Sequence, residues 1–184
     1  MEVIDLPLPG VKLIRLTTAS DERGFFKEFY RKPRYADAGI EHEFVQDNLS
    51  FSRPGVIRGM HFQSEPGQAK LVSVLQGEIF DVVVDIRKES PYFKQWIGIR
   101  LEAERHEQLF IPVGFAHGFC VLSRAGIHTP AGAFVHYKVS SVYNPATEKG
   151  FRFDDPEIGI SWPITEPSVS ERDRSSPLFR EVIS

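Results

Sequence analysis

A row of polar and cationic side chains lies in a segment that otherwise has the composition of β-strands. A strand that fills a core rarely carries a guanidinium, an imidazole and an ammonium group, because a charge buried without a partner is destabilising. The sequence therefore predicts the floor of a site for an anionic ligand. The chemistry-bearing residues of this segment, FVQDNLSFSRPGVIRGMHFQSEPGQAK, are Gln46, Asn48, Arg58, His61, Gln63 and Lys70.

The residue types suggest two kinds of chemistry. Proton transfer needs groups such as His61, His117, Tyr137 and a carboxylate such as Asp173. Anion binding needs cations, and the candidates are Arg23, Arg58, Lys70 and Arg172. Arg58 is the most informative of them, because it interrupts the apolar run VIRGMHF, where a phosphate would satisfy the guanidinium with two parallel hydrogen bonds.

Each of these residues, taken alone, also has a purely structural explanation. A histidine can be buried and bonded to a carbonyl, a tyrosine can be packed with its hydroxyl satisfied, and an aspartate can cap a turn. Surface arginines are usually solvated. The remaining histidines are assigned to this structural class: His42, His106, His128 and His136.

Two motifs partly resemble those of cupins, which makes a metal site a further candidate. The segments are GVIRGMHFQ and PVGFAHGF, in which a histidine pair and a third histidine would hold the ion. This chain has Gln63 where the second histidine is needed, and no glutamate follows at the expected spacing. One imidazole with one amide is a poor set of ligands for a transition metal, so no metal is expected. The jelly-roll fold of cupins does not depend on the metal.

Composition excludes several other functions. The 184 residues include 22 Lys and Arg against 25 Asp and Glu, a formal net charge of -3, so neither nucleic acid nor an anionic membrane is expected as a partner. The single cysteine, Cys120, cannot form an intrachain disulfide. The beginning of the chain does not resemble a signal peptide, and no segment approaches the length needed to cross a bilayer. These features favour a cytoplasmic protein.

The elements that must position the site are short strands. About ten of them in one chain of this size predict an all-β sandwich or barrel. Helix is expected only as short turns at Arg34–Ala38 and Pro156–Ile158, the tail Glu166–Ser184 is expected to be irregular, and residues 1–184 are expected to form one domain. The predicted strands are Val11–Leu16, Phe25–Tyr30, Phe44–Phe51, Gly55–Phe62, Lys70–Leu75, Glu78–Ile86, Trp96–Leu101, Glu107–Ile111, Gly118–Leu122 and Phe134–Val139.

The alternation of side chains along a strand predicts which residues share a face with His61. A period of two places His61 together with Ile57, Gly59 and Gln63, and places Arg58 on the opposite face. If the His61 face points into the barrel, Lys70 on a neighbouring strand can approach it.

Longer motifs follow one another in a fixed order along nearly the whole chain, from about Val11 to Asp173. They are DERGFFKE at Asp21–Glu28, FVQDN at Phe44–Asn48, RGMHFQ at Arg58–Gln63, QAKLV at Gln68–Val72, GEIFDVVVDIRKESPYF at Gly77–Phe93 and FIPVGFAHGF at Phe110–Phe119, followed by YNPATEKG, DDPEIGISWP and SERD. Together they closely resemble the dTDP-4-dehydrorhamnose 3,5-epimerase family. The combination of RGxHFQ with IPxGFAHGF is specific to it.

This resemblance implies a cupin-type jelly-roll β-sandwich or barrel with a few short helical turns, used as a homodimer. It implies an isomerase that converts dTDP-4-dehydro-6-deoxy-D-glucose to dTDP-4-dehydro-L-rhamnose in dTDP-L-rhamnose biosynthesis, without metal or organic cofactor. A C4 ketone acidifies the hydrogens on C3 and C5, so a base can remove one to form an enolate. Reprotonation on the opposite face then inverts the carbon.

The resemblance also assigns roles to residues. His61 matches the family's base, Asp173 the carboxylate that orients it, Lys70 the cation that stabilises the enolate oxygen, and Tyr137 the acid on the far face of the sugar. Tyr143 matches the aromatic residue that stacks on thymine. The positions that match the rest of the substrate site are Arg23, Glu28, Gln46, Asp47, Asn48, Arg58, His117, Glu148 and Arg172.

One segment departs from the family pattern. Arg124–His136 is several residues longer than expected and lacks the usual short acidic turn before the strand that carries Tyr137. Pro130 and Gly132 can place the extra residues in a protruding loop and leave Tyr137 in register. A shifted strand would instead remove the proton donor.

Three alternatives remain open at this stage. A relative that inverts only one carbon of a dTDP-4-keto-deoxysugar would use the same catalytic residues. A binding module that has lost turnover, or a metal-dependent cupin, would belong to another class of protein. Isotope exchange separates the first two from the epimerase, and metal analysis identifies the third.

Overall fold

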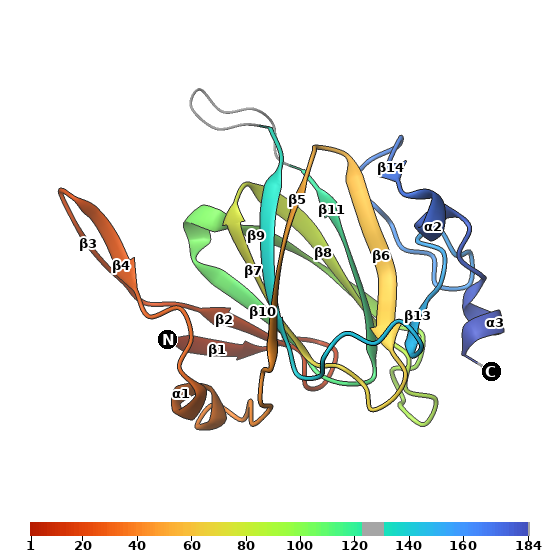
Figure 1. Ribbon diagram of the computed structural model, residues 1–184, viewed down its shortest axis with the longest axis horizontal. Coiled ribbons are helices and arrows are strands. Elements are labelled where there is room, and N and C mark those ends of the chain that lie inside the picture. Colours follow the sequence, from red (N-terminus) through yellow and green to blue (C-terminus); the bar gives the residue numbers. More distant parts are fainter. Residues whose placement is uncertain (123–130, 184) are drawn as a thin grey trace.

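The computed structural model describes residues 1–122 and 131–183, which form two facing β-sheets (Figure 1). The first sheet contains, in spatial order, β1 (Glu2–Asp5), β2 (Lys12–Arg15), β10 (Glu107–Ile111), β7 (Lys70–Gln76), β12 (Ala133–Val139) and β5 (Gln46–Ser52). The second contains β13 (Glu148–Gly150), β6 (Val56–Gln63), β11 (Phe115–Val121), β8 (Glu78–Asp85) and β9 (Trp96–Glu102), with β14 (Ser168–Val169) parallel beside β6. This is the all-β jelly-roll sandwich predicted from the sequence.

Helices are few and short, as expected. They are α1 (Lys32–Ala36), α2 (Glu171–Arg174), α3 (Phe179–Val182) and a 3-10 turn at Ala103–Arg105. The predicted helical segment Pro156–Ile158 forms a turn. The expectation of an irregular tail is wrong at α2 and α3, whose sequences are too short for a helical hydrophobic period to show. No helix in the described ranges is long and apolar enough to cross a membrane.

All the predicted strands are present, with bounds that differ by a few residues. The sequence did not reveal β1, β3 (Thr18–Asp21), β13 and β14, because they are only two to four residues long and carry little alternation. Of these, β3 pairs with β4 (Gly24–Lys27) in a hairpin that projects away from both sheets (Figure 1).

The main core lies between the two sheets. It includes Val72 and Leu109 of the first sheet and Ile79, Phe119 and Val121 of the second, all nearly inaccessible to solvent. Separate apolar clusters lie beneath α1 and beneath the C-terminal segment. This packed core holds the strands in place and so positions the polar residues described below.

An irregularity in β6 sets which residues face the interior. In the pairing of β6 with β11, Arg58 is opposite Phe119 and His61 is opposite His117. Arg58 and His61 are three residues apart on β6, whereas their partners are two residues apart on β11, so β6 contains one extra residue. The extra residue shifts the alternation, and both Arg58 and His61 line the same cavity. The prediction that they lie on opposite faces is wrong for this reason.

Gly59 makes this irregularity possible. Its φ of +126° is rarely adopted by other residues, and a Cβ atom there would lie 2.6 Å from the Cα of Gly118 and 2.9 Å from the carbonyl oxygen of His117. The two backbones pack too closely for any side chain at this position.

We expect Gly59→Ala to destabilise the fold by about 1–3 kcal/mol more than Gly24→Ala, because only the first introduces a clash. Gly24 has nearly the same φ, +127°, but a Cβ atom there would contact nothing within 4 Å. Urea unfolding of both variants measures the difference. Equal losses of stability would show that the close approach of β6 and β11 does not require glycine.

Candidate active site

A cavity of about 410 Å³ opens between the two sheets, and most of the polar residues singled out from the sequence line it. Its walls come from β5, β6, β7, β11, β12 and β13 and from the segment that carries α2. The lining residues are Ser50, Arg58, His61, Lys70, His117, Gly118, Phe119, Tyr137, Glu148, Ser170, Arg172 and Asp173.

His61 and Asp173 form a hydrogen-bonded pair at this cavity. The Nε2 of His61 lies 2.7 Å from Oδ1 of Asp173, whose side chain is buried, and the backbone N–H of Gly59 donates to the other carboxylate oxygen at 3.4 Å. Burial alone would raise the pKa of Asp173, but the bonds and charge of His61 and the Gly59 N–H outweigh it and hold that pKa below its ordinary value. The carboxylate is therefore ionised at neutral pH and can only accept, so in the neutral form of the His61 ring Nε2 carries the proton and Nδ1 has the lone pair.

The short helix α2 is held at both ends, which fixes Asp173. Before the helix, the N–H of Ser168 donates to the carbonyl of Gly55 at 2.8 Å, and the Ser170 hydroxyl caps the helix by accepting the N–H of Asp173 at 3.1 Å. After the helix, the buried Asp155 accepts the N–H of Phe179 at 2.7 Å. The carboxylate is thus held by contacts to β6, the strand that carries His61, and by the turn that contains Asp155.

A second histidine and carboxylate pair lies directly beside the first. His117 faces His61 across the β6–β11 ladder, and its Nε2–H donates to Asp81 at 2.9 Å, with both side chains buried. Burial lowers the pKa of His117, and the neighbouring charge of Lys70 lowers it further, although Asp81 opposes both effects. The ring is therefore neutral at neutral pH, with the Nδ1 lone pair free to accept a hydrogen bond.

Lys70 supplies a buried cation to the same cavity. Its ammonium group donates to the carbonyl of His61 at 3.5 Å, and the residue is only 8% exposed. Burial lowers the pKa of Lys70 to about 8, against the opposing effect of the Asp81 and Glu148 carboxylates. At neutral pH the group is still largely charged, and it can stabilise negative charge that forms on a ligand oxygen.

Tyr137 enters the cavity from the sheet opposite His61. In the sheet it lies opposite Asn48 on β5 and Val72 on β7, so β12 is paired with both neighbouring strands at this residue. The expected protruding loop lies, up to Pro130, outside the described residues. Burial raises the pKa of Tyr137, with Glu148 adding to the effect and Arg58 opposing it, so the phenol keeps its proton at neutral pH.

Polar groups follow one face of β5, the face that Tyr137 shares because Asn48 is opposite it in the β12–β5 pairing. Gln46, Asn48 and Ser50 alternate with exposed residues, and the Gln46 side-chain amide donates to Asn48 at 2.8 Å. Arg58 donates from Nε to the Ser52 hydroxyl at 2.8 Å and from one terminal nitrogen to the carbonyl of Phe51 at 3.4 Å. Several of its donors still face the cavity and can bind an anion.

Tyr143, Glu148 and Arg172 form a linked group at the rim. The phenol of Tyr143 donates to Glu148 at 3.0 Å, and Arg172 forms an ion pair with the same carboxylate. The backbone N–H of Tyr143 donates to the Gln46 side chain at 3.0 Å, which joins the rim to the polar row of β5. The ring of Tyr143 is about half exposed and available for stacking.

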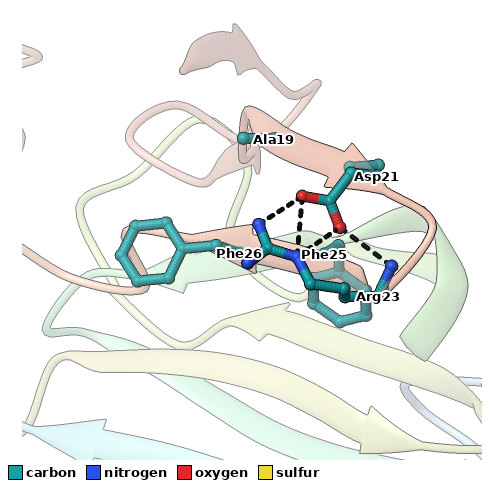
Figure 2. A pocket seen from close by; sticks show the side chains of 7 residues that line it. Ala19, Asp21, Arg23, Phe25 and Phe26 are labelled. Carbon is teal, nitrogen blue, oxygen red and sulfur yellow. Dashed lines mark hydrogen bonds and ion pairs between the residues drawn. The ribbon is translucent and has the colours of Figure 1, made fainter.

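Four predicted site residues lie outside the cavity and its rim. Gln63 is buried at the end of β6, where its side-chain amide donates to the Thr147 hydroxyl at 3.3 Å. Asp47 is on the opposite face of β5, where Lys138 donates to it at 2.6 Å. Glu28 pairs with Arg34 at 3.1 Å, near α1. Arg23 lies in the projecting hairpin and pairs with Asp21 at 2.6 Å, beside a shallow pocket of about 400 Å³ walled by Phe25 and Phe26 (Figure 2).

Sequence reasoning missed several residues of the cavity. Ser50 and Phe119 lie two residues from Asn48 and His117, so strand alternation was a usable signal for both. Ser170 precedes Asp173 by three residues, which is the pattern of a helix cap. Asp81 interrupts an apolar strand, and a carboxylate in such a place requires a partner.

This geometry suits proton transfer at a carbon next to a carbonyl group. The imidazole of His61 and the phenol of Tyr137 reach one cavity from opposite sheets, where they can act as a base and an acid, and Lys70 can stabilise an enolate between them. Cations and an aromatic ring toward the rim suit a nucleotide or another phosphate ester.

Comparisons with known proteins agree with this chemistry. The model of a family described as dTDP-4-dehydrorhamnose 3,5-epimerase matches residues 5–181. A dTDP-4-dehydrorhamnose 3,5-epimerase from Neisseria gonorrhoeae is 47% identical over 174 residues, which are 94% of this chain and 51% of that protein. One from Methanothermobacter thermautotrophicus is 44% identical over 181 residues, with 97% of this chain and 94% of that protein covered. The chain thus spans about half the length of the first relative and nearly all of the second.

A solved structure is similar throughout. It is the dTDP-6-deoxy-D-glucose-3,5-epimerase of Legionella pneumophila in complex with dTDP-4-keto-L-rhamnose, with a TM-score of 0.90 and 44% sequence identity. The match covers 97% of this chain and 93% of that one. The two folds therefore correspond over nearly their whole lengths.

We expect the ammonium group of Lys70 to lose its charge near pH 8, well below ordinary lysines at about 10.4, because burial disfavours the charged form. Reductive methylation with ¹³C-formaldehyde followed by an NMR titration measures this directly, and Lys70→Arg identifies the resonance by removing it. A Lys70 resonance that titrates together with the other lysines would contradict the buried position of this group.

Proposed function

Because the chain belongs to the dTDP-4-dehydrorhamnose 3,5-epimerase family, we propose that its cavity converts dTDP-4-dehydro-6-deoxy-D-glucose to dTDP-4-dehydro-L-rhamnose by inverting C3 and C5. The observation that carries the proposal is the placement of His61 and Tyr137 on facing sheets around one cavity. A sugar ring held between them has a base on one face and an acid on the other, which is what inversion requires.

The proton transfers follow from the positions of the groups. The Nδ1 lone pair of His61 takes the hydrogen from C3 or C5, and the electrons of the broken C–H bond move into an enolate whose oxygen is at C4. The ammonium of Lys70 stabilises that oxygen. Tyr137 then donates its phenolic proton to the same carbon from the other face, and the centre is inverted. Asp173 supports the positive charge that forms on His61.

The nucleotide is assigned to the rim and to the polar row of β5. Arg58 and Arg172 supply the charge-assisted hydrogen bonds for the diphosphate, Tyr143 stacks on the base, and Gln46 and Asn48 offer further polar contacts. Local cations therefore allow a protein with a net charge of -3 to hold an anion.

The position of the β3–β4 hairpin supports a homodimer. Arg23 lies in the turn of this hairpin, which projects away from both sheets (Figure 1), and it does not line the cavity of its own chain. The hairpin exposes Phe25 by 58% and Phe26 by 76%, and Leu49 and Phe51 are exposed on β5. We propose that a second copy covers these apolar side chains and that each hairpin brings Arg23, followed by Glu28, to the cavity of its partner. The assembly is assigned to the cytoplasm.

Isotope exchange tests the proposed reaction. When the protein is incubated with dTDP-4-dehydro-6-deoxy-D-glucose in deuterated water, we expect NMR to show deuterium at both C3 and C5. Deuterium at one carbon would assign the chain to single-centre epimerases. An absence of deuterium in spite of dTDP binding would identify a binding module.

We expect His61→Ala to slow exchange at both carbons by about 10²–10⁴-fold, because it removes the general base, while dTDP affinity changes little. His42→Ala is the matched control, since His42 lies outside the cavity. Exchange at the wild-type rate in the His61 variant would remove this residue from the mechanism.

Mixed dimers test whether Arg23 acts in the partner's cavity. We expect His61→Ala and Arg23→Glu chains to be nearly inactive alone, and to regain about a quarter of the wild-type rate after mixing, because random pairing gives each mixed dimer one complete site. Sedimentation before mixing establishes the dimer. A monomer, or a mixture that stays inactive, would show that Arg23 does not act across a dimer.

A further inference from the structure

One apolar side chain interrupts the polar wall of the catalytic cavity. Among the described residues that line it, Phe119 alone has a side chain without any polar atom. It is 4% exposed and belongs to the core between the sheets, and its ring lies 6.3 Å from that of His117. The core therefore reaches the cavity surface at this position.

The strand register places Phe119 relative to the catalytic and anion-binding groups. Phe119 is opposite Arg58 in the β6–β11 ladder, and His117, two residues earlier on the same face, is opposite His61. Along the cavity wall, Phe119 therefore lies at the level of Arg58, and the level of His61 is two residues away along β11, at His117.

The proposed substrate has one apolar substituent, the C6 methyl group on C5. In the sugar ring, C5 is joined through the ring oxygen to C1, which carries the diphosphate. When the diphosphate is at Arg58 and the hydrogen on C5 is within reach of His61, the methyl group on C5 lies along the cavity wall between the level of Arg58 and the level of His61. Phe119 is the apolar surface available there, and a polar substituent in contact with it would lose its hydrogen bonds to water.

We propose that Phe119 is a specificity-determining residue that packs against the C6 methyl group and selects 6-deoxy sugars. This inference rests on the proposed function and extends it to a group that takes no part in proton transfer. The contact also orients the ring, because the methyl group can reach Phe119 only when C5 is turned toward His61.

The test compares substrates with and without the methyl group. A 6-hydroxy sugar is unsuitable, because the enolate would form a C5–C6 double bond and expel hydroxide from C6. The probe is instead dTDP-4-dehydro-D-xylose, which lacks C6 altogether. Exchange of the hydrogen on C3 into deuterated water gives kcat/KM for both substrates with the same readout.

We expect the wild-type protein to prefer the methylated substrate by about 10–200-fold. Phe119→Leu should reduce this preference by at least about threefold, because the variant and the truncated substrate remove the same contact. Phe115→Leu is the matched control: Phe115 lies on the same strand and face and is 2% exposed, but it does not line the cavity. Phe119→Met replaces Phe119→Leu if the latter does not fold.

An unchanged preference in the Phe119 variants, or an equal loss in Phe115→Leu, would overturn the inference while the proposed function stands. A wild-type protein that exchanges neither substrate would refute the proposed function itself and the inference with it. Affinity for dTDP, measured on each variant, shows whether the nucleotide part of the site is intact.

Discussion

The close contact between two glycine backbones on paired strands is the constraint on which the site depends. Gly59 on β6 and Gly118 on β11 approach so closely that a Cβ atom on either would lie within 3 Å of the other strand's atoms. This contact allows β6 to accommodate an extra residue opposite β11. The extra residue turns both Arg58 and His61 toward the interior. Without it, regular alternation would place Arg58 and His61 on opposite faces of β6.

Burial then determines what the polar groups can do. The ionised carboxylate of Asp173 fixes the tautomer of His61, and burial keeps His117 neutral and Tyr137 protonated. Lys70 retains its charge at neutral pH although burial lowers its pKa. One cavity thus holds a neutral imidazole, a protonated phenol and an ammonium group together, because each occupies an environment that favours a different protonation state.

The sequence predicted the strands well because their apolar runs are long and bounded by turn signals. It also singled out His61, Lys70, Tyr137 and Asp173, through residue types out of place in a core and through family motifs, and the structure brings these four side chains to one cavity. It could not predict the irregularity of β6, because that depends on contact between two strands rather than on a local pattern. The partner of His117, Asp81, was missed for a similar reason, since only the sheet pairing brings them together. The location of Arg23 outside the cavity of its own chain likewise depends on tertiary structure.

The orientation of His61 is the central feature, and ¹⁵N NMR of the imidazole nitrogens measures it most directly. In the neutral ring we expect a protonated Nε2, held by Asp173, and an unprotonated Nδ1 with its lone pair free. Asp173→Asn identifies the resonance through its loss of the carboxylate bond. A neutral His61 that carries its proton on Nδ1 would leave no lone pair for the substrate and would contradict the assignment of His61 as the base.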